Sequence, residues 1–459
     1  MLTVTLLLLA CKPDDTGPTT AEEIKEAETE WITDLSIETV ADIGTTLDVT
    51  FSTATEGAAW VSYRVGDGAW QQTSQTAAAT SHRLPVIAAP YAEVTLKVVA
   101  DLDGAERESG EVSLEAGGLS PEAPVIEVTI DNYDPPDDSL LLLSVFGSPV
   151  YAMMVEFDGT VRWAHPHAEL GSTAEGGLGV VQSVVPGQLL LNTFTPGEEE
   201  NESSDLRRIN LFGEVEAQHP TPGAHHFFAE QPDGGVLWLR YASRQIGNSK
   251  VIADELMRLP ADGGDSEVLA SLWDLLPAPE PPNNADRWDW THANWLLYSP
   301  DRNSYLMSTA NTNLLLEFDP DGALLQTING DRAPVGEYRY GNDAEAFGYP
   351  HGIHWSRDGS ELLILQRTDT TSSAVRYALH EDSQQIQRIW QYGEELGHNT
   401  TVLGEVQELP DGNYLVSWGG LGILQVVTPQ QEVLWEAQTE LGHFFSHMHL
   451  ITDMYNARD

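Results

Sequence analysis

Lysine and cysteine are almost absent from this sequence, and so are long apolar segments. Four lysines occur among 459 residues, and Lys and Arg together number 22 against 71 Asp and Glu, which gives a net charge of −49. Such a charge repels phosphate backbones, which argues against a nucleic-acid partner. No stretch beyond the N-terminus is long or apolar enough to span a bilayer. A single cysteine allows no internal disulfide, so stability must come from packing.

The one cysteine, Cys11, follows a short apolar run that ends in Leu9 and Ala10. This pattern resembles a bacterial lipobox, in which the thiol receives diacylglycerol after cleavage of the preceding peptide. We therefore expect a signal peptide over 1–11, an acidic disordered tether over 12–30 and a lipid-anchored protein of the cell envelope, in the periplasm or at the outer membrane and cell surface. A basic segment before the apolar run is missing, and a free thiol is the alternative.

Residues 31–119 show short alternating runs separated by turn residues. Examples are Thr46–Phe51, Ala59–Val65 and Val94–Ala100, and Gly66-Asp67-Gly68 is a typical turn. This spacing predicts a small β-sandwich of immunoglobulin or fibronectin type III size. The Gly- and Pro-rich segment 117–124 is the expected linker.

A loose unit recurs six times over 125–459. Each copy combines an apolar strand, a turn such as Pro232-Asp233-Gly234 or Pro410-Asp411-Gly412, and a closing strand that often carries tryptophan, as at Trp163, Trp390 and Trp435. Units of this size predict an all-β fold, a six-bladed β-propeller, with a β-helix as the alternative. Helices are expected only over 22–30 and 271–276.

Histidines recur at matched positions in successive units. Counting back six residues from the residue before the turn aspartate reaches His226, Asn294 and His351. His292 precedes Asn294 by two residues, so on a strand both side chains point to the same side. Because innermost strands of neighbouring blades converge on the propeller axis, we expect these side chains to meet at one mouth of the channel.

These segments also resemble a known family. Asp289-Trp290-Thr291-His292-Ala293-Asn294, Tyr349-Pro350-His351-Gly352, Ala224-His225-His226-Phe227 and Gly404–Asn413 are similar to stretches of the bacterial arylsulfotransferases. The resemblance spans about residues 140–455. It implies an exported six-bladed propeller, with an N-terminal β-sandwich, that moves sulfate between phenols without a nucleotide donor or other cofactor.

The resemblance also implies roles for the histidines. His351 would attack an aryl sulfate to form a sulfohistidine, and His225 or His226, His292 and Asn294 would bind the sulfuryl oxygens. The family has an arginine where this chain has Ser308-Thr309-Ala310, so the cation is missing there. Arg367, or Arg240 and Arg244, are the candidates to replace it.

Other interpretations of the histidines remain open. His351 is alternatively a structural residue bonded to a carbonyl, and imidazoles from separate strands also suit zinc or copper, as in a metal-dependent hydrolase. His443, His447 and His449 are expected to be solvated or to pack in the last blade. The second functional hypothesis is a non-catalytic surface propeller that binds a ligand or partner. The leading functional hypothesis is a sulfotransferase with an aryl sulfate donor, a phenolic acceptor and no bound metal. We expect it to contact the membrane only through the lipid anchor, and homo-oligomerisation is left open.

Overall fold

The computed structural model describes residues 30–147, 149–166, 177–194, 204–277, 279–282, 285–342 and 345–456. The expected signal peptide, Cys11, nearly all of the tether and nearly all of the helix expected over 22–30 lie outside them. Two compact units are present: Val40–Thr46 belongs with Gly118 onward, and the segments up to Thr39 and Leu47–Gly117 form the other unit. Within the described residues no helix is long and apolar enough to cross a membrane.

The N-terminal unit consists of strands that are linked by pairing into one seven-stranded sheet. The strands are β1 (Ile32–Thr39), β2 (Thr46–Val65), β3 (Gln71–Gln72), β4 (Ala79–Ile87), β5 (Glu93–Leu102), β6 (Ala105–Glu108) and β7 (Val112–Glu115). The runs Thr46–Phe51 and Ala59–Val65, which were predicted as separate strands, are both part of β2. This strand continues through Gly57 and pairs first with β1 and then with β5. A sandwich of two facing sheets stays a prediction.

The C-terminal unit contains six sheets, which we number as blades 1 to 6 in chain order and describe from the innermost strand outward. Blade 1 comprises β34 (Phe444–Ile451), β9 (Leu140–Phe146), β10 (Tyr151–Val155) and β11 (Val161–Pro166). Blade 2 comprises β12 (Gly177–Gln182), β13 (Gln188–Phe194), β14 (Asp205–Asn210) and β15 (Val215–Pro220). Blade 3 comprises β16 (Ala224–Glu230), β17 (Val236–Ile246), β18 (Ser249–Leu259) and β19 (Glu267–Ser271), with β20 (Arg287–Asp289) added beside β18.

The other three blades follow the same order. Blade 4 comprises β21 (Ala293–Ser299), β22 (Ser304–Thr309), β23 (Leu314–Phe318) and β24 (Leu324–Asn329). Blade 5 comprises β26 (His351–Trp355), β27 (Glu361–Arg367), β28 (Ser372–His380) and β29 (Gln385–Tyr392), with β25 (Arg339–Tyr340) beside β29. Blade 6 comprises β30 (Glu405–Glu408), β31 (Tyr414–Ser417), β32 (Ile423–Val427) and β33 (Val433–Thr439), with β8 (Ile126–Asp131) beside β33. The helical pieces are α2 (Leu272–Leu275), η3 (Glu381–Ser383), η4 (Glu394–Leu396) and η5 (Gly419–Leu421).

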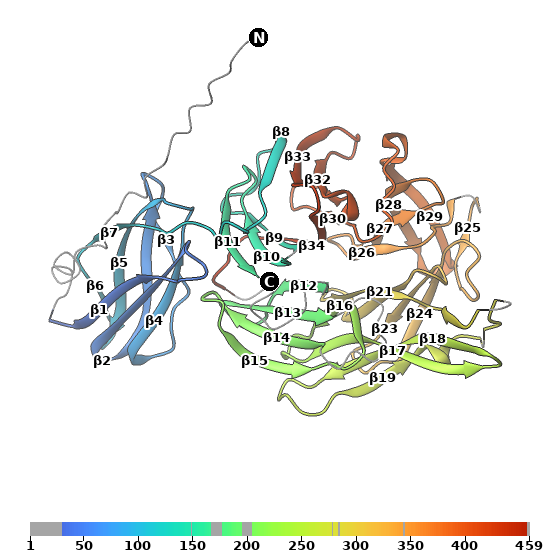
Figure 1. Ribbon diagram of the computed structural model, residues 1–459, viewed down its shortest axis with the longest axis horizontal. Coiled ribbons are helices and arrows are strands. Elements are labelled where there is room, and N and C mark those ends of the chain that lie inside the picture. Colours follow the sequence, from blue (N-terminus) through green and yellow to red (C-terminus); the bar gives the residue numbers. More distant parts are fainter. Residues whose placement is uncertain are drawn as a thin grey trace, which may run out of the picture. The chain divides into compact units, whose positions relative to one another are not determined.

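The ring is closed by strands from both ends of the propeller sequence. The last strand, β34, pairs with β9 as the innermost strand of blade 1, and β8 pairs with β33 as the outermost strand of blade 6. Neighbouring innermost strands contact one another around the ring (Figure 1). The predicted all-β, six-bladed propeller is confirmed.

Recurrent Asp-Gly turns set the ends of the strands. Gly234, Gly359 and Gly412 have φ of 90°, 68° and 84°, a backbone conformation that glycine adopts without steric cost. The preceding aspartate accepts a hydrogen bond from a backbone N–H two residues on, at 2.9 Å for Asp233 and 3.0 Å for Asp411. These turns join the innermost strand to the next one in blades 3, 5 and 6, so the opposite ends of the innermost strands lie together at the other mouth.

Tryptophans on the outer strands of blades 1, 5 and 6 connect these blades to the next one in the ring. The indole N–H of Trp163 donates to the carbonyl of Leu211 at 3.0 Å, and that of Trp435 donates to Phe157 at 2.6 Å. Trp390 donates in the same way to Pro429 at 3.0 Å. Buried indoles need such a partner for the N–H. These three tryptophans therefore join neighbouring blades.

Candidate active site

Three innermost strands share an irregularity where the histidines lie. The pairing register shifts between Ala224 and Phe228 in β16, between Ala293 and Trp295 in β21, and between His351 and His354 in β26. A bulge redirects side chains and ends regular pairing, and such bulges are common next to functional sites. Blades 3, 4 and 5 therefore present their histidines in the same non-regular way at the start of the innermost strand.

Two of these histidines have strained backbones. His226 has φ of 53° and His292 has φ of 51°, in the left-handed region that non-glycine residues rarely adopt. Such a conformation costs on the order of 1–3 kcal/mol and persists only where the surroundings impose it. Strand alternation predicted that His292 and Asn294 lie on one face of a strand. That prediction is wrong, because His292 precedes β21 and its direction is set by a left-handed turn.

The rings of the three blades gather at one mouth of the channel. The centroids of the His226 and His292 rings are 4.8 Å apart, with the rings nearly perpendicular. Burial lowers the pKa of His226 well below its ordinary value, and the neighbouring His292, His225 and His351 lower it further. The segments that the sequence singled out are therefore brought together around one space.

His351 is held in a defined tautomer. Its Nδ1–H donates to the carbonyl of Gly404 at 2.8 Å, so Nε2 carries the lone pair. Gly352 permits this approach, because a Cβ there would lie 2.2 Å from the Cβ of Glu405. Burial lowers the pKa of His351 to about 4. At neutral pH the ring is an uncharged imidazole with an available nucleophilic nitrogen.

His292 has the opposite electrostatic character. Its Nδ1 lies 2.5 Å from Oδ2 of Asp289. Burial acts to lower the pKa of His292, but the hydrogen bond and the charge of Asp289 outweigh it, and the pKa is raised above its ordinary value. His292 is therefore the histidine of the group best suited to hold and donate a proton.

His225 supports His226 and links blades 3 and 4: its Nδ1 lies 2.8 Å from Nδ1 of His226. It is buried, its Nε2 lies 3.0 Å from Oδ1 of Asp254, and its ring stacks on Tyr241 at 3.8 Å. The other oxygen of Asp254 accepts hydrogen bonds from the Thr291 hydroxyl at 2.5 Å and the Ala293 N–H at 2.6 Å. Of the two adjacent histidines, His226 is thus the one that lies beside His292. The sequence analysis missed Asp254, whose only signal was an acidic residue directly after the apolar run 251–253.

Both polar atoms of the Asn294 side-chain amide are hydrogen-bonded within the protein. Its Nδ2 donates to the carbonyl of Pro350 at 3.1 Å, and its Oδ1 accepts from the Ser308 hydroxyl at 2.5 Å. The side chain is buried. Asn294 therefore holds the peptide that precedes His351, a supporting contact that the predicted substrate-binding role did not include.

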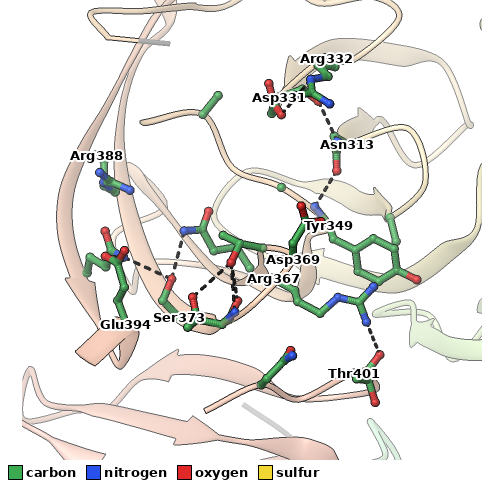
Figure 2. Close-up of a pocket in the computed structure, with 18 of the residues that line it drawn as sticks. Asn313, Asp331, Arg332, Tyr349, Arg367, Asp369, Ser373, Arg388, Glu394 and Thr401 are labelled. Carbon is green, nitrogen blue, oxygen red and sulfur yellow. Dashed lines mark hydrogen bonds and ion pairs between the residues drawn. The ribbon is translucent and has the colours of Figure 1, made fainter. Parts of the chain in front are cut away.

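Arg367 is the cation that approaches the histidines. It lies at the end of β27, its guanidinium covers the Tyr349 ring at 3.9 Å, and its Nη1 donates to the Thr401 carbonyl at 2.6 Å. Its charge acts to lower the pKa of both His292 and His351. Figure 2 shows the Arg367 side chain extended beneath Tyr349 toward Thr401.

The other two candidate arginines are engaged elsewhere. Arg240 pairs with Glu255, and Arg244 lies 3.6 Å from Asp274. Ala310, where the motif resemblance implied that a family arginine is replaced, is buried, and its N–H donates to the His292 carbonyl at 3.0 Å. The charge beside the histidines therefore comes from blade 5 through Arg367.

A family model, Arylsulfotransferase (ASST), matches residues 126–334 and 354–453, well over half of the chain. The chain belongs to the arylsulfotransferase family. The match is interrupted over 335–353, the segment that holds His351, so the role of His351 rests on the geometry and the motif resemblance alone.

Solved structures add little to the arylsulfotransferase assignment. A Bacteroides caccae protein of unknown function is 15% identical over 69% of this chain and 99% of its own, with a TM-score of 0.44. A periplasmic gluconolactonase from Pseudomonas aeruginosa is 16% identical over 68% and 99%, with a TM-score of 0.40. Virginiamycin B lyase from Staphylococcus aureus is 15% identical over 57% and 74%, with a TM-score of 0.33. These scores are too low to carry an argument. No curated protein matches the chain.

A second histidine cluster, which the sequence analysis missed, surrounds Glu405. The carboxylate of Glu405 is fully buried and lies 3.0 Å from both His354 Nε2 and His447 Nδ1. The N–H of Met448 donates to it at 2.5 Å. Burial acts to raise the pKa of Glu405, but the two histidines outweigh it and the pKa is lowered. Because Glu405 follows Gly404, the cluster also fixes the carbonyl that holds His351.

His447 was expected to be solvated or to pack in the last blade. It is not solvated, because innermost strand β34 carries it to the axis, where it is buried and lies against Glu405 of blade 6. His443 and His449 remain partly exposed. Trp295 packs against the His351, His354 and His447 rings at centroid distances of 5.7, 5.7 and 5.4 Å. In the part of the chain that the structure covers, no group of three or more His, Cys, Asp or Glu is arranged to hold a metal ion.

Proposed function

We propose that this arylsulfotransferase-family chain transfers a sulfuryl group from an aryl sulfate ester to a phenol through a sulfohistidine at His351. The observation that carries the proposal is the hydrogen bond from His351 Nδ1 to the Gly404 carbonyl, which leaves Nε2 unprotonated. The lowered pKa keeps this nitrogen available as a nucleophile at neutral pH.

In the first half-reaction, Nε2 of His351 forms a bond to sulfur and the bond between sulfur and the aryl oxygen breaks. Protonated His292, with its pKa raised by Asp289, donates a proton to the departing phenolate oxygen. His226 and Arg367 supply N–H donors and positive charge for the sulfuryl oxygens as negative charge collects there.

The second half-reaction reverses these roles. An acceptor phenol gives its proton to His292 as its oxygen bonds to sulfur, and the N–S bond to His351 breaks. The free imidazole and the protonated His292 are regenerated, so no cofactor and no nucleotide donor is consumed. Asp289 holds His292 in position through both steps.

The test is the covalent adduct. Brief exposure of the protein to 4-nitrophenyl sulfate should release 4-nitrophenol and add one SO3 group to the peptide that contains His351, and a second phenol should remove it. His351→Ala should form no adduct. Release of 4-nitrophenol without any adduct on His351 would reject the mechanism.

A second candidate function is ligand binding without turnover, and the alanine at position 310 favours it. Removal of a cation from a site that binds a developing anion costs roughly 10²–10³ in rate. If Arg367 does not replace that cation, aryl sulfates should bind without losing the sulfuryl group. Calorimetric binding of 4-nitrophenyl sulfate with no release and no adduct would select this alternative.

We further propose that Cys11 carries a lipid anchor and that the protein resides in the cell envelope. The support is the Leu9-Ala10-Cys11 sequence followed by an acidic segment rich in Thr and Pro. Cells fed a labelled fatty acid should label the protein, and Cys11→Ala should remove both the label and the membrane association.

A further inference from the structure

A cavity of about 880 Å³ lies beside the candidate site, and some of its lining residues contact or neighbour the site histidines. Tyr349 and Arg367 line it, as Figure 2 shows, and Ala310 lines it as well. Ala310 is hydrogen-bonded to the backbone of His292, and Arg367 acts electrostatically on His351. The rest of the lining comes from blades 4 and 5 and the loops that follow them. The volume falls within the roughly 300–1,000 Å³ of pockets that enclose a small molecule.

The lining is unusually polar for a pocket of this size. Nine of the nineteen lining residues are neutral amides or alcohols, and the only apolar side chains are two alanines and the ring of Tyr349. An apolar ligand would remove water from these groups without replacing its hydrogen bonds, which is costly. The lining therefore selects against a purely hydrocarbon or polyaromatic group.

The charges around the cavity balance. Its lining holds three arginines and three acidic residues: Arg332, Arg367, Arg388, Asp331, Asp369 and Glu394. Arg332 lies 3.5 Å from Asp331. With three charges of each sign, neither an anionic nor a cationic group has a net attraction to the cavity as a whole. What fits is an uncharged group with many hydroxyls.

Several polar side chains of the wall are fixed by one another. Gln366 Nε2 donates to the Ser373 hydroxyl at 3.1 Å, and Gln391 Nε2 donates to Glu394 at 2.8 Å. Asn313 donates to the Asp331 carbonyl at 2.7 Å. A wall of donors and acceptors already held in place loses less side-chain freedom when a ligand binds.

We propose that this cavity receives the polyhydroxylated part of the phenolic substrate, such as the sugar of a phenolic glycoside, while the phenolic oxygen lies at His351. The identity of the phenolic end rests on the proposed function. The recognition of a neutral hydroxyl-rich group rests on the cavity itself.

The test compares two acceptors with the same phenol. In 4-hydroxyphenyl β-D-glucoside and 4-methoxyphenol, the phenol stands opposite an ether oxygen that carries either glucose or methyl. With 4-nitrophenyl sulfate as donor, kcat/KM should favour the glucoside by about tenfold, the value of one or two added hydrogen bonds. A ratio near one would overturn the proposal.

Two variants of the same strand locate the effect. Gln391→Leu removes an amide from the cavity wall and should lower the preference at least threefold, with the rate on 4-methoxyphenol unchanged. Gln387→Leu, at an exposed position of β29 outside the lining, should change neither. An unchanged preference in Gln391→Leu would place the sugar elsewhere.

A binding measurement separates this proposal from the proposed function. Calorimetry without donor should show tighter binding of the glucoside than of 4-methoxyphenol, and Gln391→Leu should reduce the difference at least threefold. If neither phenol is sulfated but this binding pattern is present, the sulfotransferase proposal fails and the cavity proposal stands. If both phenols are sulfated but bind equally, the cavity proposal fails alone.

Discussion

The propeller axis carries two histidine groups that differ in how many of their histidines contact the nearby carboxylate, one in the first group and two in the second. At the mouth, His226, His292 and His351 come from three blades and are half-buried, and His292 is bonded to a carboxylate, that of Asp289. Around Glu405, His354 and His447 lie on a buried carboxylate at 3.0 Å each. The first group has lowered pKa values at His226 and His351, and the second has a lowered pKa at Glu405.

This difference indicates that the group at the mouth is suited to reaction and the group around Glu405 to structural support. A neutral imidazole with a free nitrogen beside strained backbone is suited to chemistry, and such strain concentrates at functional sites. A buried carboxylate satisfied by two histidines and a backbone N–H is suited to holding three innermost strands together. Four variants test that separation.

The largest expected effect is on turnover, from His351→Ala. Release of 4-nitrophenol from its sulfate ester should fall by at least about 10³-fold, because the proposed nucleophile is removed. His380→Ala, an exposed position on β28, is the matched control and should retain full activity. Equal activity in both variants would remove His351 from the mechanism.

The second effect is on stability, from Glu405→Ala. Loss of the buried partner of two histidines should lower the free energy of unfolding by about 3–5 kcal/mol, measured with urea. Glu432→Ala, which removes an exposed carboxylate, should lower it little. Because the pKa of Glu405 lies below its ordinary 4.5, its stabilisation is present above pH 4.5 and is lost as the pH falls.

The third effect is on rate without loss of stability, from Arg367→Met. The variant keeps an apolar contact with Tyr349 but removes the charge, and kcat should fall by about 10²-fold. Arg357→Met, an exposed arginine of the same blade, is the control. A normal rate in Arg367→Met would show that the cation missing at position 310 has not been replaced from blade 5.

The smallest effect is on the pH profile. The rate should rise with pH through about 4, where His351 loses its proton, and fall above the raised pKa of His292, where the general acid is lost. Asp289→Asn should move the alkaline limb to lower pH and leave the acid limb in place. The measurement is kcat/KM as a function of pH, with 4-nitrophenyl sulfate as the substrate, and movement of both limbs would contradict the assignment.

Much of the candidate site could be predicted from the sequence, because the motifs that mark it are local and recur in successive blades. The Pro-Asp-Gly turns and their relatives give a common reference point in each unit. Counting back from them placed His226, Asn294 and His351 at equivalent strand positions. The contacts of Asp254, Glu405 and His447 were not predicted, because their partners are distant in sequence and most of them lie on other blades. His292 was predicted to belong to the site from strand alternation. Its direction is in fact set by a left-handed backbone conformation, which strand alternation does not describe.

The sequence by itself determined the family, the all-β propeller and which segments reach the axis, because strand period, turn chemistry and motif order are local properties of the chain. Only the tertiary structure decided which histidine of the 225–226 pair lies beside His292, which nitrogen of His351 is free and which arginine lies near it. These depend on bulges, buried carboxylates and carbonyls contributed by neighbouring blades, and such contacts exist only once the ring has closed.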